Sequence, residues 1–419
     1  MTRRDLASHR CRDSERISVR QQKHLPQENR FAGQRKHQSQ ENRFAAADKT
    51  DEEGNAAMKV WDLHCDTLSE LRYAENSGHP VSFEENGLMM DLKRMKEGDY
   101  LLQCFGCFVN LGRKNENPLK ACMEMIDIFY RMLDKYPELM QIKTPQDIRE
   151  LKSSGKIGAM LTVEEGAVCL DDVRVLRDLY RLGVRMMTLT WNYDNGLAHP
   201  NTPISTESRN SDCGQKAGSA GDPNSNTAGG QGSSFAAVQK TEEWPMRGNE
   251  QGLTSKGIEF VEEMNRLHMI IDVSHLSDGG FRDVARYSKM PFAASHSDCR
   301  ALTGHARNLT DEMIRTMAER GGLIGLNYCA QFLDPDPDRT AVKSRIIDMT
   351  RHARHMFDVG GEDILALGSD FDGIDGDLEI KGAQDMPLLA DGLRKAGFTQ
   401  RQVDKIFHAN AERFFGENL

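Results

Sequence analysis

The chain has 419 residues, of which 38% are hydrophobic and 28% charged, and its formal net charge is −10. A net negative charge argues against a nucleic-acid-binding protein, which would usually carry a basic surface. No apolar run reaches the roughly 18 residues of a membrane span, and the first residues lack the apolar core of a secretion signal. We therefore expect a soluble, cytoplasmic protein that binds neither nucleic acid nor membranes.

Two polar segments stand apart from the rest of the chain. Residues 1–57 are arginine-rich and contain the hexapeptide QENRFA twice. They have too little apolar surface to offset the entropy of ordering. We expect them to be disordered, or to be upstream sequence outside the native protein, because Met58 directly precedes a strand-like segment. A polar low-complexity insertion is expected at about 205–252, where Gly, Ser, Asn and Gln dominate. The catalytic domain is therefore expected in residues 58–419.

Short apolar runs, typical of buried strands, alternate with amphipathic stretches across this domain. The predicted strands are Lys59–His64, Leu101–Leu111, Ile157–Glu164, Arg185–Thr190, Met269–His275, Phe292–His296, Gly322–Tyr328 and Ile364–Asp370. The predicted helices are Leu119–Leu133, Val173–Leu182, Gly279–Tyr287, Thr310–Arg320, Ala341–Phe357 and Thr399–Phe415. Eight strands alternating with helices predict a TIM-like (β/α)8 barrel. The alternative, a doubly wound open sheet, is disfavoured because no GxGxxG loop follows a strand.

Metal-binding residue types stand at the C-terminal ends of five predicted strands. They are His64 and Asp66, Glu164 and Glu165, His275, His296, and Asp370 and Asp372. One such residue would usually be structural, but the C-terminal strand ends of a barrel meet at the face where chemistry occurs. The alignment of five strands predicts one shared site there. Asp372 is better interpreted as a turn cap.

The residue types at this face indicate a metal site with enough ligands for two cations. His64 and Asp66 are expected on one face of a strand, because side chains alternate, and can bind one cation. His275 and His296 can hold a second, with a glutamate bridging the pair. Imidazole and carboxylate ligands together suit zinc, and two ions about 3.5–4 Å apart can activate water and polarise a carbonyl. Asp370 is the predicted carboxylate that then carries protons.

Four motifs follow one another along the chain: WDLHCD at 61–66, IDVSH at 271–275, ASHS at 294–297 and GSDFDG at 368–373. Together they resemble the membrane (renal) dipeptidase family of zinc peptidases (peptidase family M19). The resemblance extends over nearly all of residues 58–419. It implies a TIM-like barrel with two zinc ions per chain and hydrolysis of dipeptides by a hydroxide that bridges the metals.

The resemblance also implies a role for each site residue. The ligands would be His64 and Asp66 for the first zinc, His275 and His296 for the second, and Glu164 as the bridge. The adjacent Glu165 leaves the choice of bridging glutamate open. Asp370 would be the proton shuttle. Arg307 would hold the terminal carboxylate of the substrate, since a guanidinium binds carboxylates with two parallel hydrogen bonds.

One substrate-binding position departs from the family pattern. Where the family has a histidine after Leu-Thr, this chain has Trp191. An indole donates one hydrogen bond but cannot take up a proton, so the natural substrate is left open; His199 is an alternative source of the imidazole. A related amidohydrolase acting on N-acyl or modified amino acids, and a catalytically impaired metal-binding barrel, remain alternatives to a dipeptidase. The expected partner is a small dipeptide, and a homodimer is left open.

Overall fold

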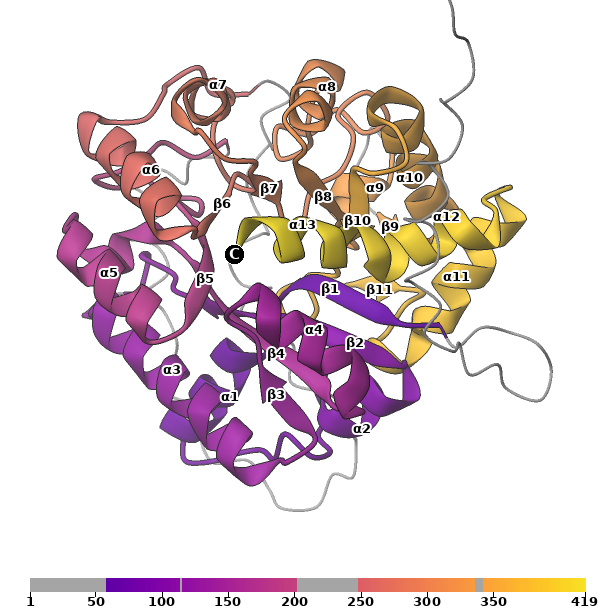
Figure 1. The fold of residues 1–419 in the computed structure, drawn as a ribbon, viewed down its shortest axis with the longest axis horizontal. Coiled ribbons are helices and arrows are strands. Elements are labelled where there is room, and N and C mark those ends of the chain that lie inside the picture. Colours follow the sequence, from indigo (N-terminus) through magenta and orange to yellow (C-terminus); the bar gives the residue numbers. More distant parts are fainter. Residues whose placement is uncertain (1–57, 114, 202–247, 336–341) are drawn as a thin grey trace, which may run out of the picture. The chain divides into compact units, whose positions relative to one another are not determined.

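The computed structural model describes residues 58–113, 115–201, 248–335 and 342–419. The predicted N-terminal segment, and residues 205–247 of the predicted insertion, lie outside this description. Within it, eight parallel strands close into a barrel, because β2 pairs with β1 on one side and with β4 on the other. Helices surround the barrel (Figure 1). The predicted TIM-like fold is confirmed.

All eight barrel strands lie in or beside the predicted apolar runs. They are β1 (Val60–Cys65), β2 (Tyr100–Phe108), β4 (Ile157–Glu164), β5 (Val184–Thr188), β6 (Ile270–Asp272), β7 (Ala293–Ala294), β8 (Leu323–Leu326) and β10 (Leu365–Leu367). A short β3 (Leu139–Gln141) adds to β4 outside the barrel. Two further short strands, β9 (Lys343–Ser344) and β11 (Asp377–Leu378), pair with each other.

The helices include all six predicted ones and several that the sequence pattern did not indicate. They are α1 (Thr67–Asn76), α2 (Leu92–Glu97), α3 (Pro118–Lys135), α4 (Pro145–Ser154), α5 (Val173–Arg181), α6 (Ser255–Leu267), α7 (Asp278–Tyr287), α8 (Asp311–Glu319), α9 (Ala330–Leu333), α10 (Ile346–Gly360), α11 (Met386–Lys395), α12 (Gln400–Asp404) and α13 (Asn410–Asn418). The predicted Thr399–Phe415 helix is capped by Thr399 as expected. It contains a π-helical turn, Lys405–Ala409, between α12 and α13.

The amino-terminal end of the barrel is closed by the last helix. Phe415 of α13 stacks on Trp61 at the start of β1, with ring centroids 5.6 Å apart. Phe414 and Phe415 belong to one core cluster with residues of the barrel strands, and α13 crosses the strands in Figure 1. The aromatic side chains of α13 fill the amino-terminal end of the barrel. Polar side chains can therefore gather only at the carboxyl-terminal end. None of the helices in the described residues combines the length and apolar character needed to cross a membrane.

Candidate metal centre

His64 reaches the barrel mouth because of an irregularity in β1. Trp61 and Leu63 belong to the core cluster that the barrel strands share with α13. Regular alternation along β1 would therefore turn His64 to the opposite face of the strand, away from this core. The register of β1 against β2 shifts between Asp62 and Cys65, which brings His64 inward. Gly106 of β2 leaves the necessary space, since a Cβ there would lie 3.0 Å from His64 Cε1. The strand ends at Cys65, and Asp66 follows as the N-cap residue of α1, so the expectation that His64 and Asp66 lie on one face of a strand is wrong.

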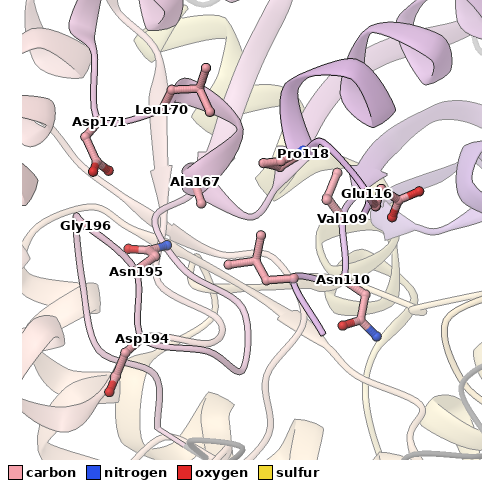
Figure 2. A pocket seen from close by; sticks show the side chains of 11 residues that line it. Val109, Asn110, Glu116, Pro118, Ala167, Leu170, Asp171, Asp194, Asn195 and Gly196 are labelled. Carbon is pink, nitrogen blue, oxygen red and sulfur yellow. The ribbon is translucent and has the colours of Figure 1, made fainter. Parts of the chain in front are cut away.

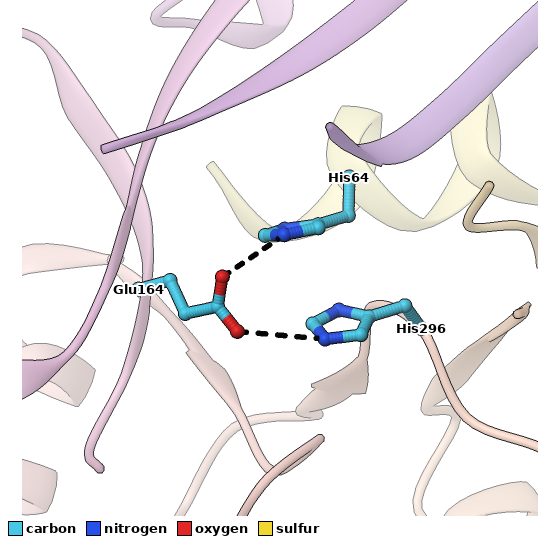
Figure 3. Close-up of side chains that lie close together, drawn as sticks. All are labelled: His64, Glu164 and His296. Carbon is cyan, nitrogen blue, oxygen red and sulfur yellow. Dashed lines mark ion pairs between the residues drawn. The ribbon is translucent and has the colours of Figure 1, made fainter. Parts of the chain in front are cut away.

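Glu164, at the end of β4, lies among three imidazoles. Its Oε2 is 3.1 Å from His64 Nε2, while its Oε1 is 2.8 Å from His275 Nε2 and 3.6 Å from His296 Nε2. Figure 3 shows the carboxylate between His64 and His296. The side chain is only 2% exposed. One carboxylate therefore faces both predicted halves of the site, which is the arrangement of a bridging ligand.

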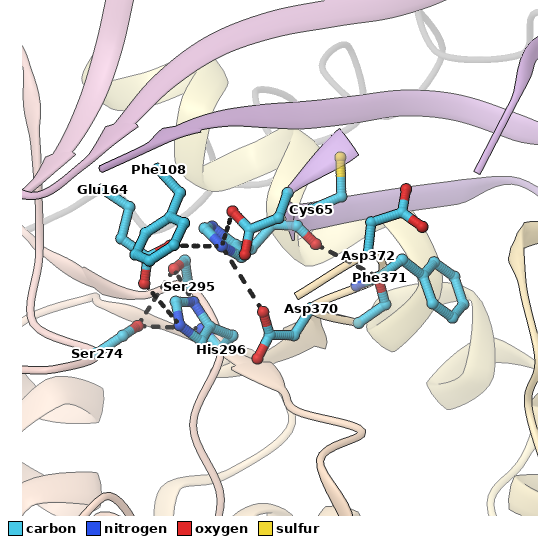
Figure 4. Close-up of polar contacts among 12 residues, drawn as sticks. Cys65, Phe108, Glu164, Ser274, Ser295, His296, Asp370, Phe371 and Asp372 are labelled. Atoms are coloured by element: carbon cyan, nitrogen blue, oxygen red, sulfur yellow. Dashed lines mark hydrogen bonds and ion pairs between the residues drawn. The ribbon is translucent and has the colours of Figure 1, made fainter. Parts of the chain in front are cut away.

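The two downstream imidazoles face each other through their Nε2 atoms. Nδ1 of His275 is 3.0 Å from Asn192 Oδ1, which can only accept a hydrogen bond, so His275 Nδ1 donates. Ser295 Oγ lies 2.7 Å from His296 Nδ1 (Figure 4). The two Nε2 atoms then face each other at 3.0 Å. Two neutral imidazoles with Nε2 atoms this close can both be ligands of one cation.

Asp66 and Asp370 complete the cluster from the other side of His64. Their Oδ1 atoms lie 3.7 and 3.8 Å from His64 Nε2. Asp370 adopts a left-handed φ of 63°, a strained conformation for a non-glycine residue that is often found at functional sites. Gly373 makes room for both carboxylates, because a Cβ there would lie 2.3 Å from Asp66 Oδ2 and 2.6 Å from Asp370 Oδ1.

Glu165 points away from the cluster. Its carboxylate accepts hydrogen bonds from Ala167 N, Trp191 N and Asn195 Nδ2. Its φ of 109° lies in the left-handed region, and this turn of the backbone directs consecutive glutamates to different surroundings. Of the two glutamates that the sequence left open, the structure places Glu164 among the histidines.

Burial and neighbouring charges shift the pKa values of the groups in the cluster. Burial and the charge of Arg307 lower the pKa of His275 to about 4, so its imidazole is neutral at pH 7. Burial opposes the charged form of Glu164. The charge of His64 and hydrogen bonds with His275 and His296 outweigh this effect, so the pKa of Glu164 falls well below its usual value. His64 Nε2 and Asp66 Oδ1 are buried atoms that form ion-pair contacts but no hydrogen bond among the described residues. This donor set fits a metal site.

The candidate ligand atoms are close enough to share ions. One ligand atom from each of His64, Glu164 and His296 lies within 4.8 Å of the others, and the same holds for His64, Asp66 and Asp370. Figure 4 shows Glu164, His296 and Asp370 converging from different strands. The structure therefore brings together all five predicted metal ligands and the predicted proton shuttle.

Arg307 lies at the edge of this cluster, fully buried behind His275. Its Nη2 is 2.9 Å from His275 Nε2 and donates to His296 O at 3.2 Å. Its Nη1 donates to the carbonyl of Ser274 and to Ser297 Oγ. Its Nε has no hydrogen-bond partner among the described residues and so retains a donor.

Trp191 forms an aromatic wall beside His275. Its ring centroid lies 6.1 Å from that of His275 and 4.9 Å from that of Phe108, and its side chain is 4% exposed. His199, the alternative imidazole, contacts Asp194 Oδ1 at 2.8 Å. Trp191, the predicted substrate-binding residue, thus presents an apolar surface next to the candidate metal ligands.

A cavity of about 420 Å³ opens at the same rim of the barrel, lined by the loops that follow β2, β4 and β5 (Figure 2). None of the predicted metal ligands lines it. It lies close to the cluster, because Val109 in its wall donates to Glu164 O at 3.2 Å. Leu111, also in its wall, packs against the aromatic group of Phe108, Trp191 and Tyr193. This aromatic group therefore lies beside both the cavity and His275.

Several supporting residues were not assigned a role from the sequence. Asp62, Asp272, Ser295 and Ser369 stand inside the recognised motifs, while Asn192 and Asn327 follow strands β5 and β8. Asn327 Nδ2 donates to Asp370 Oδ2 at 3.1 Å, and Asn327 Oδ1 accepts from Cys329 N. The sequence signal for the first four is their place in motifs that carry predicted ligands, whereas Asn192 and Asn327 are marked only by following the ends of barrel strands.

Fold and site together define a (β/α)8 barrel with a candidate metal centre at the carboxyl-terminal end of its strands. The sequence matches the profile of the membrane dipeptidase family (peptidase family M19) over residues 52–218 and 227–418. An uncharacterised dipeptidase of Schizosaccharomyces pombe is 30% identical over 375 residues, which are 85% of this chain and 79% of that protein.

Two solved structures are similar over most of the chain. Dipeptidase AC, a metallopeptidase of family M19, is 26% identical with a TM-score of 0.71, covering 86% of this chain and 98% of its own. A metallopeptidase from Rhodobacter sphaeroides, liganded with a phosphinate mimic of the dipeptide L-Ala-D-Ala, is 25% identical with a TM-score of 0.71 and covers 86% and 99%. The chain belongs to the membrane dipeptidase family and is a metallopeptidase that hydrolyses peptide bonds.

Proposed function

We propose that the protein is a zinc-dependent dipeptidase with two zinc ions per chain. His64 and Asp66 would hold one ion, His275 and His296 the other, and Glu164 would bridge them. The position of the Glu164 carboxylate, with one oxygen toward His64 and the other toward His275 and His296, carries this proposal. When bound, the two ions would supply a Lewis acid for the scissile carbonyl and a bridging hydroxide as nucleophile.

Asp370 is the proposed proton carrier. Burial raises the pKa of Asp370 to about 7, which suits a group that takes and returns a proton near neutral pH. Asn327 donates to its Oδ2, so Oδ1 faces the cluster. Oδ1 lies 3.8 Å from His64 Nε2, at the edge of the candidate metal ligands. From there it could take a proton from the attacking water and give one to the leaving amine.

Arg307 is the proposed anchor for the free carboxylate of the substrate. Its buried guanidinium is adjacent to His275, and its Nε retains a donor. Trp191 provides an apolar surface on the same side. This combination favours a small substrate that carries a carboxylate next to its scissile bond.

Metal dependence and substrate class can be tested in one experiment. We expect the purified protein to contain two zinc ions per chain and to hydrolyse members of a panel of L-L and L-D dipeptides faster than N-acyl amino acids. Dialysis against a chelator should abolish this activity, and added zinc should restore it. Less than one bound metal per chain, with no activity gained on adding zinc, would contradict the proposal. Faster turnover of the N-acyl amino acids would favour the related amidohydrolase instead.

Arg307→Lys tests the carboxylate anchor. Lysine keeps the positive charge but lacks the Nε donor that Arg307 retains. Since a hydrogen bond to a charged group contributes about 1.5–3 kcal/mol, we expect kcat/KM for dipeptides to fall by about 10- to 100-fold. The loss should be much smaller for a dipeptide amide, which lacks the carboxylate. An equal loss on both substrates would exclude the proposed contact.

A further inference from the structure

Two pairs of buried Asp and Ser residues clamp neighbouring strands in the same way. Ser369 N and Oγ donate to Asp62 Oδ1 and Oδ2 at 2.8 and 2.5 Å, joining β10 to β1. Ser295 N and Oγ donate to Asp272 Oδ1 and Oδ2 at 2.9 and 2.5 Å, joining β7 to β6. All four side chains are at most 2% exposed. In both pairs the serine directly precedes a residue of the metal centre.

The two clamps differ in what the serine hydroxyl accepts. Each hydroxyl has one proton, and each gives it to an aspartate that can only accept. Ser295 Oγ must therefore accept from His296 Nδ1, at 2.7 Å. Ser369 Oγ instead accepts from the backbone of Phe371, at 3.2 Å, and its second contact is with the backbone carbonyl of His64, at 3.3 Å, not with the imidazole. Only the Asp272 clamp ends on a metal-ligand imidazole.

Asp272 is held as an anion by its surroundings. In addition to Ser295, its carboxylate accepts from Ser274 N and Oγ at 3.0 and 2.7 Å and from Thr188 Oγ1 at 3.0 Å. Five donors around one buried carboxylate stabilise its charge. By contrast, the hydrogen-bond partner of His275 Nδ1 is the neutral amide oxygen of Asn192. His296 is therefore linked through Ser295 to a negative charge, whereas His275 is hydrogen-bonded to an uncharged group.

We propose that Asp272 and Ser295 form a relay that positions His296 and sets the affinity for the cation held by His275 and His296. The relay keeps the proton on Nδ1, leaves the Nε2 lone pair free for the cation, and places a buried negative charge behind the imidazole to balance the cation's charge. Ser295 and Asp272 are thus positioning residues that act through His296. This inference rests on the proposed binuclear centre.

Ser295→Ala and its matched control Ser369→Ala test the relay. Each removes a serine hydroxyl from an equivalent clamp, but only Ser295→Ala removes the acceptor of His296 Nδ1. We expect Ser295→Ala to bind one of its two ions about 10- to 100-fold more weakly, measured by titrating the metal-free protein with Zn²⁺ or Co²⁺ against a chromophoric chelator. The visible absorption of the Co²⁺ protein should change with it. Ser369→Ala should bind both ions with wild-type affinity.

Wild-type affinity for both ions in Ser295→Ala, or an equal loss in Ser369→Ala, would overturn the relay. Asp272→Asn, which keeps the shape of the side chain and removes its charge, provides a second variant if Ser295→Ala does not fold, and the same weakening of one ion is expected. The wild-type titration separates the two proposals. A wild-type protein that binds no metal contradicts the proposed function, whereas two tightly bound ions in wild type and variants contradict only the relay.

Discussion

Glu164→Gln is expected to lower kcat/KM by about 10³-fold, a loss of about 4 kcal/mol in transition-state stabilisation. The amide has one oxygen and no charge, so it could not bridge two ions held by the imidazoles that now lie 2.8–3.6 Å from the Glu164 carboxylate. We therefore also expect the bound metal to fall from two ions to one or fewer, as measured by elemental analysis after gel filtration. The loss of metal distinguishes a ligand from a residue that acts only on the substrate.

Glu165→Gln is the matched control for this experiment, since it makes the same chemical change one residue away. Glu165 contacts Ala167 N, Trp191 N and Asn195 Nδ2, so its variant should lose thermal stability and keep both metals. If Glu165→Gln loses metal while Glu164→Gln retains it, the bridging ligand has been assigned to the wrong glutamate.

Asp370→Asn is expected to lower kcat by about 10²- to 10⁴-fold, the usual contribution of a positioned acid–base group. Asparagine has nearly the same shape but cannot take up and return a proton. KM for the best dipeptide should stay within a few-fold of the wild-type value, and both metals should remain bound. Steady-state kinetics on the zinc-loaded protein, together with metal analysis, measure these three quantities.

Asp372→Asn controls for the shared turn. Asp372 also has a left-handed φ, of 67°, but its carboxylate accepts from Thr67 Oγ1 and Met89 N, both at 2.7 Å. Its variant should therefore unfold at a lower temperature with kcat close to wild type. Unchanged turnover in Asp370→Asn would show that another group carries the proton, and a large loss of kcat in Asp372→Asn would mean that disturbing the turn is sufficient.

The sequence alone determined the barrel and the face on which its site lies. Apolar runs with the right spacing marked all eight barrel strands, because each buried strand must be apolar along its own length. Ligand residue types at the strand ends then marked one face, since parallel strands bring their carboxyl ends together. Helices such as α4 and α11 were not predicted. Their stability depends on packing against the barrel, to which a short amphipathic pattern adds little.

Only the tertiary structure decided which atoms face one another. Glu164 and Glu165 are equivalent in the sequence, and the φ of 109° at Glu165 separates their surroundings. The sequence placed His64 and Asp66 on one face of a strand, whereas in the structure β1 ends at Cys65 and its register shifts between Asp62 and Cys65. The contact of Asp272 with Ser295, 23 residues away, likewise depends on the pairing of β6 with β7. A sequence pattern reports local burial, whereas a metal centre depends on side-chain directions set by backbone irregularities and by contacts between distant strands.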